Sequence, residues 1–193
     1  MDTIVAKITN DSLTDKKIYE QAGKILREGG LVAFPTETVY GLGADALDEK
    51  ASAKIYAAKG RPSDNPLIVH IADIEALYKL SCEVPDKALK LADKFWPGPL
   101  TMILKKSDIV PDSITGGLGT VAIRMPSHKV AAELIRTSGV YIAAPSANTS
   151  GKPSPTRASH VIKDLSGKID MIIEDDTVDI GVESTIIDLS EEV

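Results

Sequence analysis

One stretch of the sequence, residues 59–70, places two cations, an amide and a histidine around a turn. It reads Lys59-Gly60-Arg61-Pro62-Ser63-Asp64-Asn65-Pro66-Leu67-Ile68-Val69-His70. Gly60 and Pro62 should end the preceding helical pattern, because glycine is a poor helix former and proline lacks the backbone donor. Lys59 and Arg61 would then lie beside a loop, where ligands are commonly bound. A solvated helix C-terminus, whose dipole favours basic residues, is the alternative interpretation.

Composition limits the classes of protein that this chain can represent. With 193 residues, 43% of them hydrophobic and 26% charged, the chain can form one compact domain with a sizeable core. Its net charge of −6 argues against a surface that coats nucleic acid, although a local basic groove stays compatible with that charge. Cys82 is the single cysteine, which excludes an internal disulfide framework and a multi-cysteine metal site.

The sequence also carries no sign of membrane insertion. No apolar run approaches the roughly 20 residues that span a bilayer. The start, Met1-Asp2-Thr3, is acidic and unlike a secretory signal. We therefore expect a cytoplasmic protein.

Helical and strand-like patterns alternate along the chain, which predicts an α/β sheet covered by helices, with functional groups on loops at strand ends. Helices are expected from Thr14 to the Gly29-Gly30 pair, over 50–59, 74–80, 85–95 and 157–165, and after Ser127; the expected caps are Thr14, Ser127 and Thr156. Strands are expected over 31–34, 67–71, 100–104, 121–125, 140–144, 171–174 and 184–189, with loops over 35–43, 108–120 and 145–155. We expect Trp96 to fill the core, and we expect no chemical role for His128, His160 or Cys82.

Familiar nucleotide-binding and hydrolase motifs are missing. The sequence holds no GxxxxGK[ST], GxGxxG, HExxH or GxSxG pattern. What remains are polar loops that join small hydroxyl residues to glycine or proline, at 35–43, 59–70, 116–124, 145–151 and 181–185. If these loops converge, they line a cavity whose cations are Lys59, Arg61 and Arg124, and such a cavity suits phosphate together with a small zwitterion. Five unrelated turns would use the same residue types, so this alternative stays open.

Four motifs, taken in chain order, resemble those of the YrdC-like threonylcarbamoyl-AMP synthases. They are the 35–43 segment, Lys59-x-Arg61, Ser146-x-Asn148 and the 181–185 segment, and the resemblance extends over about residues 18–189. It implies an α/β fold with a twisted mixed sheet and flanking helices around a large central cavity. It also implies synthesis of L-threonylcarbamoyl-AMP from L-threonine, bicarbonate and ATP, with release of pyrophosphate. The product would go to a tRNA-modifying transferase that acts on an adenosine next to the anticodon.

The resemblance also implies roles for individual residues. It places ATP on Lys59, Arg61, Asn65, Thr120, Ser146, Asn148 and Ser154, with Lys59 and Arg61 catalytic, and it places threonine on Thr38, His70, Arg124, Ala144 and Ser184. The chemistry agrees for Arg124, whose planar fork matches a carboxylate, although a surface strand arginine is the alternative. His70 lies in an apolar run, and we expect it to contact the threonine hydroxyl or a neighbouring side chain rather than to act as a base. Thr38 and Ser184 could equally be turn hydroxyls that bond their own backbone.

A magnesium ion is expected to arrive with the phosphates of ATP. Its protein ligands are unknown, and Glu37 and Glu183 are the nearest carboxylates in these loops. Longer members of the family continue past the last strand into an arginine-containing loop, a linker and a second domain. We therefore expect 1–193 to be a single YrdC-like domain and favour its being the N-terminal part of a two-domain synthase.

Two other functions stay open from the sequence. One is a non-enzymatic module that binds double-stranded RNA or tRNA, with phosphate contacts from Lys59, Arg61, Arg124, Lys152 and Arg157. The other is a carbamoyl transferase of the type that matures hydrogenases, in which related domains occur. Those enzymes carry zinc-finger-like segments, whereas this sequence has no cysteine pairs. The synthase accounts for more of the motifs than either alternative.

Overall fold

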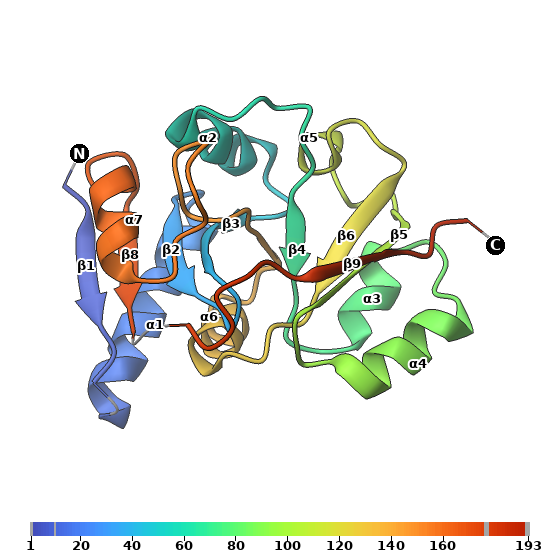
Figure 1. Ribbon diagram of the computed structural model, residues 1–193, viewed down its shortest axis with the longest axis horizontal. Coiled ribbons are helices and arrows are strands. Elements are labelled where there is room, and N and C mark those ends of the chain that lie inside the picture. The colour runs from blue at the N-terminus through green and yellow to red at the C-terminus, as the bar shows by residue number, and fades with distance from the viewer. Residues whose placement is uncertain (1, 10, 176–177, 192–193) are drawn as a thin grey trace.

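The computed structural model describes residues 2–9, 11–175 and 178–191 (Figure 1). Its strands are β1 (Ile4–Lys7), β2 (Val32–Pro35), β3 (Tyr40–Asp45), β4 (Ile68–His70), β5 (Leu100–Lys105), β6 (Thr120–Arg124), β7 (Ile142–Ala143), β8 (Met171–Glu174) and β9 (Thr185–Asp188). Within the described residues these strands form a nine-stranded sheet in the order β1-β8-β2-β3-β7-β4-β6-β5-β9. Parallel and antiparallel pairs are mixed, so the expected α/β fold with a mixed sheet is confirmed.

Helices cover both faces of this sheet. They are α1 (Ser12–Arg27), α2 (Glu49–Lys59), α3 (Glu75–Leu80), α4 (Asp86–Phe95), α5 (Asp112–Thr115), α6 (Lys129–Ser138) and α7 (Ala158–Leu165). Val32 and Phe34 of β2 pack in one hydrophobic cluster with α1 and α6, whereas Ala33 packs in the other with α2 and α7. Successive strand residues point to opposite faces, so a strand between two helical layers is apolar throughout, as β2 is.

The predicted helix caps are wrong, although the helices themselves are present. Thr14 lies inside the first turn of α1, where its N–H donates to Oδ2 of the actual cap, Asp11, at 2.9 Å. His128, not Ser127, caps α6, because its Nδ1 accepts from the N–H of Val130 at 3.2 Å. Thr156 does not cap α7, which begins after Arg157 without a side-chain cap. Several polar residues precede each of these helices, and the sequence does not show which side chain turns back.

β3 and α5 occupy segments that were expected to be loops. Gly41 and Gly43 suggested a turn, but β3 needs glycine for a different reason. A Cβ at Gly43 would lie 2.7 Å from Cγ2 of Ile142 and 2.8 Å from Cε1 of Phe34. Glycine therefore lets β3 pass closely between its neighbours β2 and β7.

The register of three neighbouring strands sets three functional groups in one row. His70 of β4 lies opposite Arg124 of β6, and Arg124 lies opposite Thr101 of β5. Residues directly opposite each other on adjacent strands point to the same face of a sheet. The backbone pairing thus places an imidazole, a guanidinium and a hydroxyl side by side.

Three further expectations concern single side chains and membrane insertion. Trp96 fills the core as expected, and its Nε1 donates to the carbonyl of Leu100 at 2.7 Å. Cys82 is a free, exposed thiol. Within the described part of the chain, none of the helices has the length and apolar character needed to cross a bilayer.

Gly43→Ala should lower the free energy of unfolding by about 1–3 kcal/mol, because the new methyl group overpacks against Phe34 and Ile142. Urea denaturation of the two proteins measures the difference. Gly119→Ala is the control, because a Cβ there meets no atom of the described residues within 4 Å. Equal stability of Gly43→Ala and Gly119→Ala would contradict the packing given for β3.

Candidate functional site

A cavity of about 360 Å³ lies where the ends of β3, β4 and β6 meet the polar loops. Every residue that was expected to hold threonine lies on its wall: Thr38, His70, Arg124, Ala144 and Ser184. They come from segments far apart in the sequence, so the expected convergence of the loops is present in the structure. Five unrelated turns would not give this arrangement.

The residues expected to hold ATP divide into two groups. Arg61, Asn65 and Ser146 lie on the cavity wall. Lys59, Thr120, Asn148 and Ser154 are not among the described residues that line it. Thr120 begins β6, and Ser154 donates to Oε1 of Glu183 at 2.7 Å, so Ser154 reaches the cavity only through that lining carboxylate.

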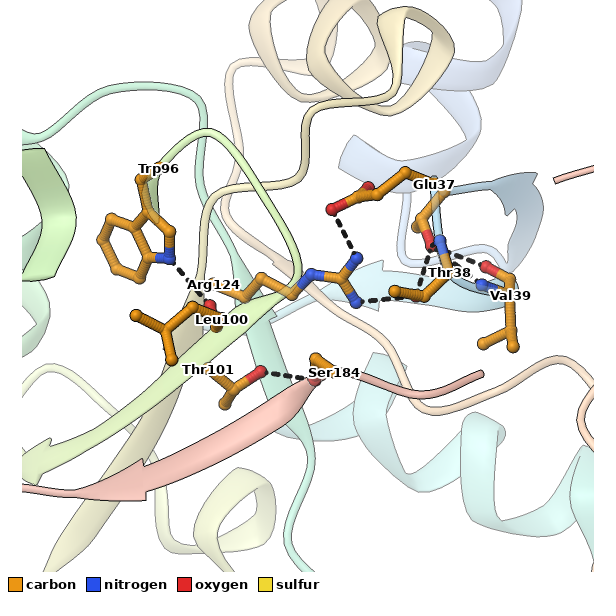
Figure 2. A network of polar contacts seen from close by, with 9 residues as sticks. Glu37, Thr38, Val39, Trp96, Leu100, Thr101, Arg124 and Ser184 are labelled. Atoms are coloured by element: carbon orange, nitrogen blue, oxygen red, sulfur yellow. Dashed lines mark hydrogen bonds and ion pairs between the residues drawn. The ribbon is translucent and has the colours of Figure 1, made fainter. Parts of the chain in front are cut away.

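A buried ion pair joins the 36–38 loop to β6 (Figure 2). Nη2 of Arg124 lies 2.7 Å from Oε1 of Glu37, and the two side chains are 4% and 6% exposed. Burial alone would raise the pKa of Glu37, but the charge and hydrogen bonding of Arg124 outweigh it and hold that pKa below its usual value. Glu37 is therefore ionised at neutral pH, and its charge is committed to Arg124. No signal in the sequence identified this role of Glu37.

Hydroxyl groups on the same loop are oriented by their hydrogen bonds (Figure 2). Thr36 Oγ1 can donate to the carbonyl of Val39 at 2.7 Å. Thr36 Oγ1 also accepts from the N–H groups of Thr38 and Val39, both at 3.2 Å, and lies 3.0 Å from Thr38 Oγ1, where either hydroxyl can donate. Thr38 Oγ1 also accepts from Nη1 of Arg124 at 3.0 Å. Arg124 and Thr36 thus orient the Thr38 hydroxyl on the cavity wall.

Two arginines on the wall carry buried donors without acceptors. Within the described residues, Nε of Arg61 and Nε of Arg124 are buried and have no acceptor, whereas Nη2 of Arg124 is engaged by Glu37. Leaving such donors unpaired costs free energy, and native proteins rarely do so without a reason. Arg61 is fixed in this position by its bond to the carbonyl of Pro66 at 3.2 Å. An anion that entered the cavity would supply the acceptors that these arginines lack.

His70 is neutral in this site. It is 3% exposed, and its ring packs edge-on against Phe34 with 6.2 Å between centroids. Burial and then the charge of Arg124 lower its pKa to about 3. Nδ1 lies 3.2 Å from the carbonyl of Ile68, which can only accept, so Nδ1 carries the hydrogen. The neutral ring cannot serve as a general acid near pH 7.

Ser184 is held from behind by a residue that the sequence did not single out. Its Oγ lies 2.7 Å from Oγ1 of Thr101, which is fully buried in β5 (Figure 2). In the sequence, nothing distinguishes Thr101 from the other residues of the expected strand 100–104. Its position beside Arg124 follows only from strand register. The backbone N–H of Ala144 is already used, because it donates to the carbonyl of Ile68 at 2.9 Å.

Comparison with known families gives one clear match. A family model named for Sua5, YciO and YrdC, and described as telomere recombination, matches residues 24–193. A protein of Pyrococcus abyssi named threonylcarbamoyl-AMP synthase is 59% identical over 98% of this chain and 55% of its own length. A Bacillus subtilis protein of the same name is 55% identical over 96% of this chain and 54% of its own length.

Solved structures agree with the family match. The structure of P. abyssi Sua5 in complex with L-threonine has a TM-score of 0.93 and 56% identity, over 99% of this chain and 55% of that chain. The chain thus spans about 55% of the length of these relatives.

His70→Gln should flatten the dependence of stability on pH between about pH 4 and 6.5. The pKa of His70 is about 3 in the folded state, against an ordinary 6.5, so within this window His70 binds a proton in the unfolded state only. The free energy of unfolding therefore decreases as the pH is lowered from about 6.5 to 4. At pH 5 this loss amounts to about 2 kcal/mol. Urea denaturation at a series of pH values measures it.

The matched control for this prediction is His160→Gln, which replaces an exposed histidine on α7 and should leave the pH profile as it is in the parent chain. Parallel profiles for the parent and His70→Gln would contradict a buried, neutral His70.

Proposed function

The chain belongs to the Sua5, YciO and YrdC family, and on that premise we propose that it makes L-threonylcarbamoyl-AMP from L-threonine, bicarbonate and ATP, releasing pyrophosphate. The product would serve a transferase that modifies a tRNA adenosine next to the anticodon. The names of relatives at 55–59% identity support this reaction. The observation that carries the proposal is the pair of arginines, Arg61 and Arg124, whose buried donors meet one cavity without acceptors among the described residues.

Threonine fits the end of the cavity around Arg124. Its carboxylate would accept from the unpaired Nε of that arginine and from the adjacent Nη2, whose two N–H groups can serve Glu37 and a ligand together. The Thr38 hydroxyl oxygen and the unprotonated Nε2 of the neutral His70 can accept from the ammonium and hydroxyl groups of the substrate. Ser184, fixed by Thr101, adds a further hydroxyl. The relative whose structure contains L-threonine supports this choice of ligand.

ATP fits the side of the cavity that Arg61, Asn65 and Ser146 line. The unpaired Nε of Arg61 would meet phosphoryl oxygens, and the polar side chains of Asn65 and Ser146 would bind other parts of the nucleotide. Threonine and ATP would then lie against different parts of one wall, so their reacting ends can approach each other.

The reaction requires alignment more than an activated side chain. The ammonium of threonine first loses a proton to water. The neutral amine then adds to carbon dioxide with loss of a second proton to water, or to bicarbonate with loss of a water molecule, and gives an N-carboxylate. An oxygen of this carboxylate attacks the α-phosphorus of ATP, the bond to the β-phosphate oxygen breaks, and pyrophosphate leaves. The reactants are anions that repel one another, so positioning and charge stabilisation by Arg61 and Arg124 are the main contributions of the protein.

Magnesium would be held mainly by the nucleotide. Glu37 is committed to Arg124, and Glu183 is the one carboxylate among the described residues that line the cavity. No group of three or more His, Cys, Asp or Glu side chains in the described part of the chain could hold a metal ion. Phosphate oxygens and water are ligands that suit Mg²⁺, with Glu183 as a contact from the protein. When bound, the ion would neutralise phosphate charge.

The structure gives little support to the RNA-binding alternative, because most of the basic side chains on which it depends are buried or paired. Lys59 and Arg124 are 2% and 4% exposed, and neither can present its charge to an RNA backbone. Lys152 is paired with Asp164 at 2.7 Å. No contact among the described residues favours RNA over a nucleotide and an amino acid.

The test of this function is to incubate the chain with Mg²⁺, ATP, L-threonine and bicarbonate, and to detect threonylcarbamoyl-AMP by mass spectrometry. We expect a product that requires both threonine and bicarbonate. Arg61→Ala should lower turnover by a factor on the order of 10² or more, the scale for removing one electrostatic stabiliser.

Arg157→Ala, which removes an exposed arginine, is the matched control and should retain the turnover of the parent. Turnover of Arg61→Ala that equals this control would refute the phosphate role of Arg61. Absence of any product from the folded parent would refute the proposed reaction for this chain.

A further inference from the structure

Lys59 and Arg61 flank one glycine but meet different surroundings. Gly60 ends α2 in the left-handed conformation, with φ of 62°, so the chain reverses between the two cations. Arg61 lies on the cavity wall. Lys59 is 2% exposed and is not among the described residues of that wall, which raises the question of what its charge does.

The ammonium of Lys59 is fully engaged by one loop. Nζ donates to the carbonyl of Ser146, to the carbonyl of Asn148 at 2.6 Å, and more weakly to Oδ1 of Asn148 at 3.4 Å. A lysine ammonium has three N–H donors, and these three acceptors use them all. A phosphate oxygen could bind Lys59 only by displacing one of these acceptors.

The same loop, residues 146–152, is tied down on its other sides. The N–H of Ser150 donates to the carbonyl of Lys59 at 2.9 Å. Nδ2 of Asn148 donates to the carbonyls of Thr149 and Lys152 at 2.9 and 2.8 Å. The N–H of Thr149 donates to Oδ2 of Asp164 at 3.2 Å. The peptide between Asn148 and Thr149 thus lies between a cation and an anion, an arrangement in which each hydrogen bond polarises the next.

The charges around Lys59 are consistent with this structural position. Burial and then Arg61 lower the pKa of Lys59 to about 8, while Glu183 and Asp164 act in the opposite direction. At neutral pH the side chain is still mostly protonated and keeps all three donors. Burying an ion costs free energy unless polar partners compensate, and here the loop carbonyls are those partners.

We propose that Lys59 is a positioning residue: it holds the 146–152 loop so that Ser146 faces the nucleotide, while Arg61 meets the phosphates directly. We call the hydrogen bonds of Lys59 and Asp164 to the 146–152 loop the junction, and Asn148 belongs to this junction rather than to the cavity wall. The nucleotide in this inference rests on the proposed function, whereas the attachment of the loop to Lys59 does not. The motif Lys59-x-Arg61 then combines one structural and one ligand-binding cation.

Hydrogen exchange in the chain without ligand tests the attachment. Lys59→Met should speed exchange of the amides in 146–152 by about tenfold or more, because several hydrogen bonds of the loop are lost together. Arg61→Met should leave exchange in that loop unchanged. Lys17→Met, which alters an exposed lysine on α1, is the matched control, and protection of β2 and β8 reports that each variant is folded. Unchanged exchange in 146–152 of Lys59→Met would overturn the proposal.

A second variant weakens the junction from its opposite side. Asp164→Asn should speed exchange in 146–152 less than Lys59→Met does, because it removes a charge but keeps an acceptor for Thr149. This variant decides the matter if Lys59→Met fails to fold. Exchange in the folded Asp164→Asn protein that equals the parent's would count against the junction.

Titration of ATP and of adenosine separates positioning from direct phosphate contact. Lys59→Met should weaken both ligands by a similar factor, because a displaced loop affects the nucleoside as much as the phosphates. Arg61→Met should weaken ATP much more than adenosine. A loss confined to ATP in Lys59→Met would show direct phosphate contact and overturn the proposal. If the parent binds neither ligand, the proposed function fails, and the exchange result alone still decides whether Lys59 holds the loop.

Discussion

Burial of Arg124 beside Glu37 is the constraint on which the rest of the site depends. Removing two charges from water costs several kcal/mol for each ion, and their mutual attraction repays this only when the geometry and the remaining hydrogen bonds are favourable. Oε1 of Glu37 lies 2.7 Å from Nη2 of Arg124, and Thr38 adds a hydroxyl acceptor, but Nε of the arginine has no acceptor within the described residues. The pair is therefore stable enough to form and still incomplete, and an anionic ligand would complete it.

The sheet converts this pair into a site with defined geometry. Strand register sets His70, Arg124 and Thr101 in one row, and Thr101 in turn holds Ser184. Gly43 leaves room for Phe34, whose ring packs on His70. Side chains on paired strands are held more tightly than side chains on free loops, so the end of the cavity around Arg124, where we propose that threonine binds, is preorganised by the fold. The proposed nucleotide end relies on the 146–152 loop instead, and the buried Lys59 donates to two carbonyls of that loop.

Much of the fold follows from sequence periodicity, because strands and helices buried in layers need continuous or 3.6-residue apolar patterns. The pattern fails at β3, where Gly41 and Gly43 suggest a turn, since the need for glycine arises from neighbours that the sequence does not reveal. For the site, local motifs identify Arg61, His70 and Arg124 as candidates. They do not identify Glu37 as the partner of Arg124 or Thr101 as the support of Ser184, because both relations depend on contacts between distant segments. The contact of the Lys59 side chain with the carbonyls of Ser146 and Asn148 likewise joins distant segments, so the sequence does not reveal it.

Calorimetric titration of L-threonine into the parent chain and into Arg124→Lys tests the central claim most directly. The account predicts that the parent binds threonine and that Arg124→Lys binds it at least about tenfold more weakly, because lysine keeps the charge but lacks the planar fork that a carboxylate needs. Arg157→Lys, which changes an exposed arginine, should bind as the parent does. Equal affinity of the parent and Arg124→Lys, or no binding by the folded parent, would contradict the account.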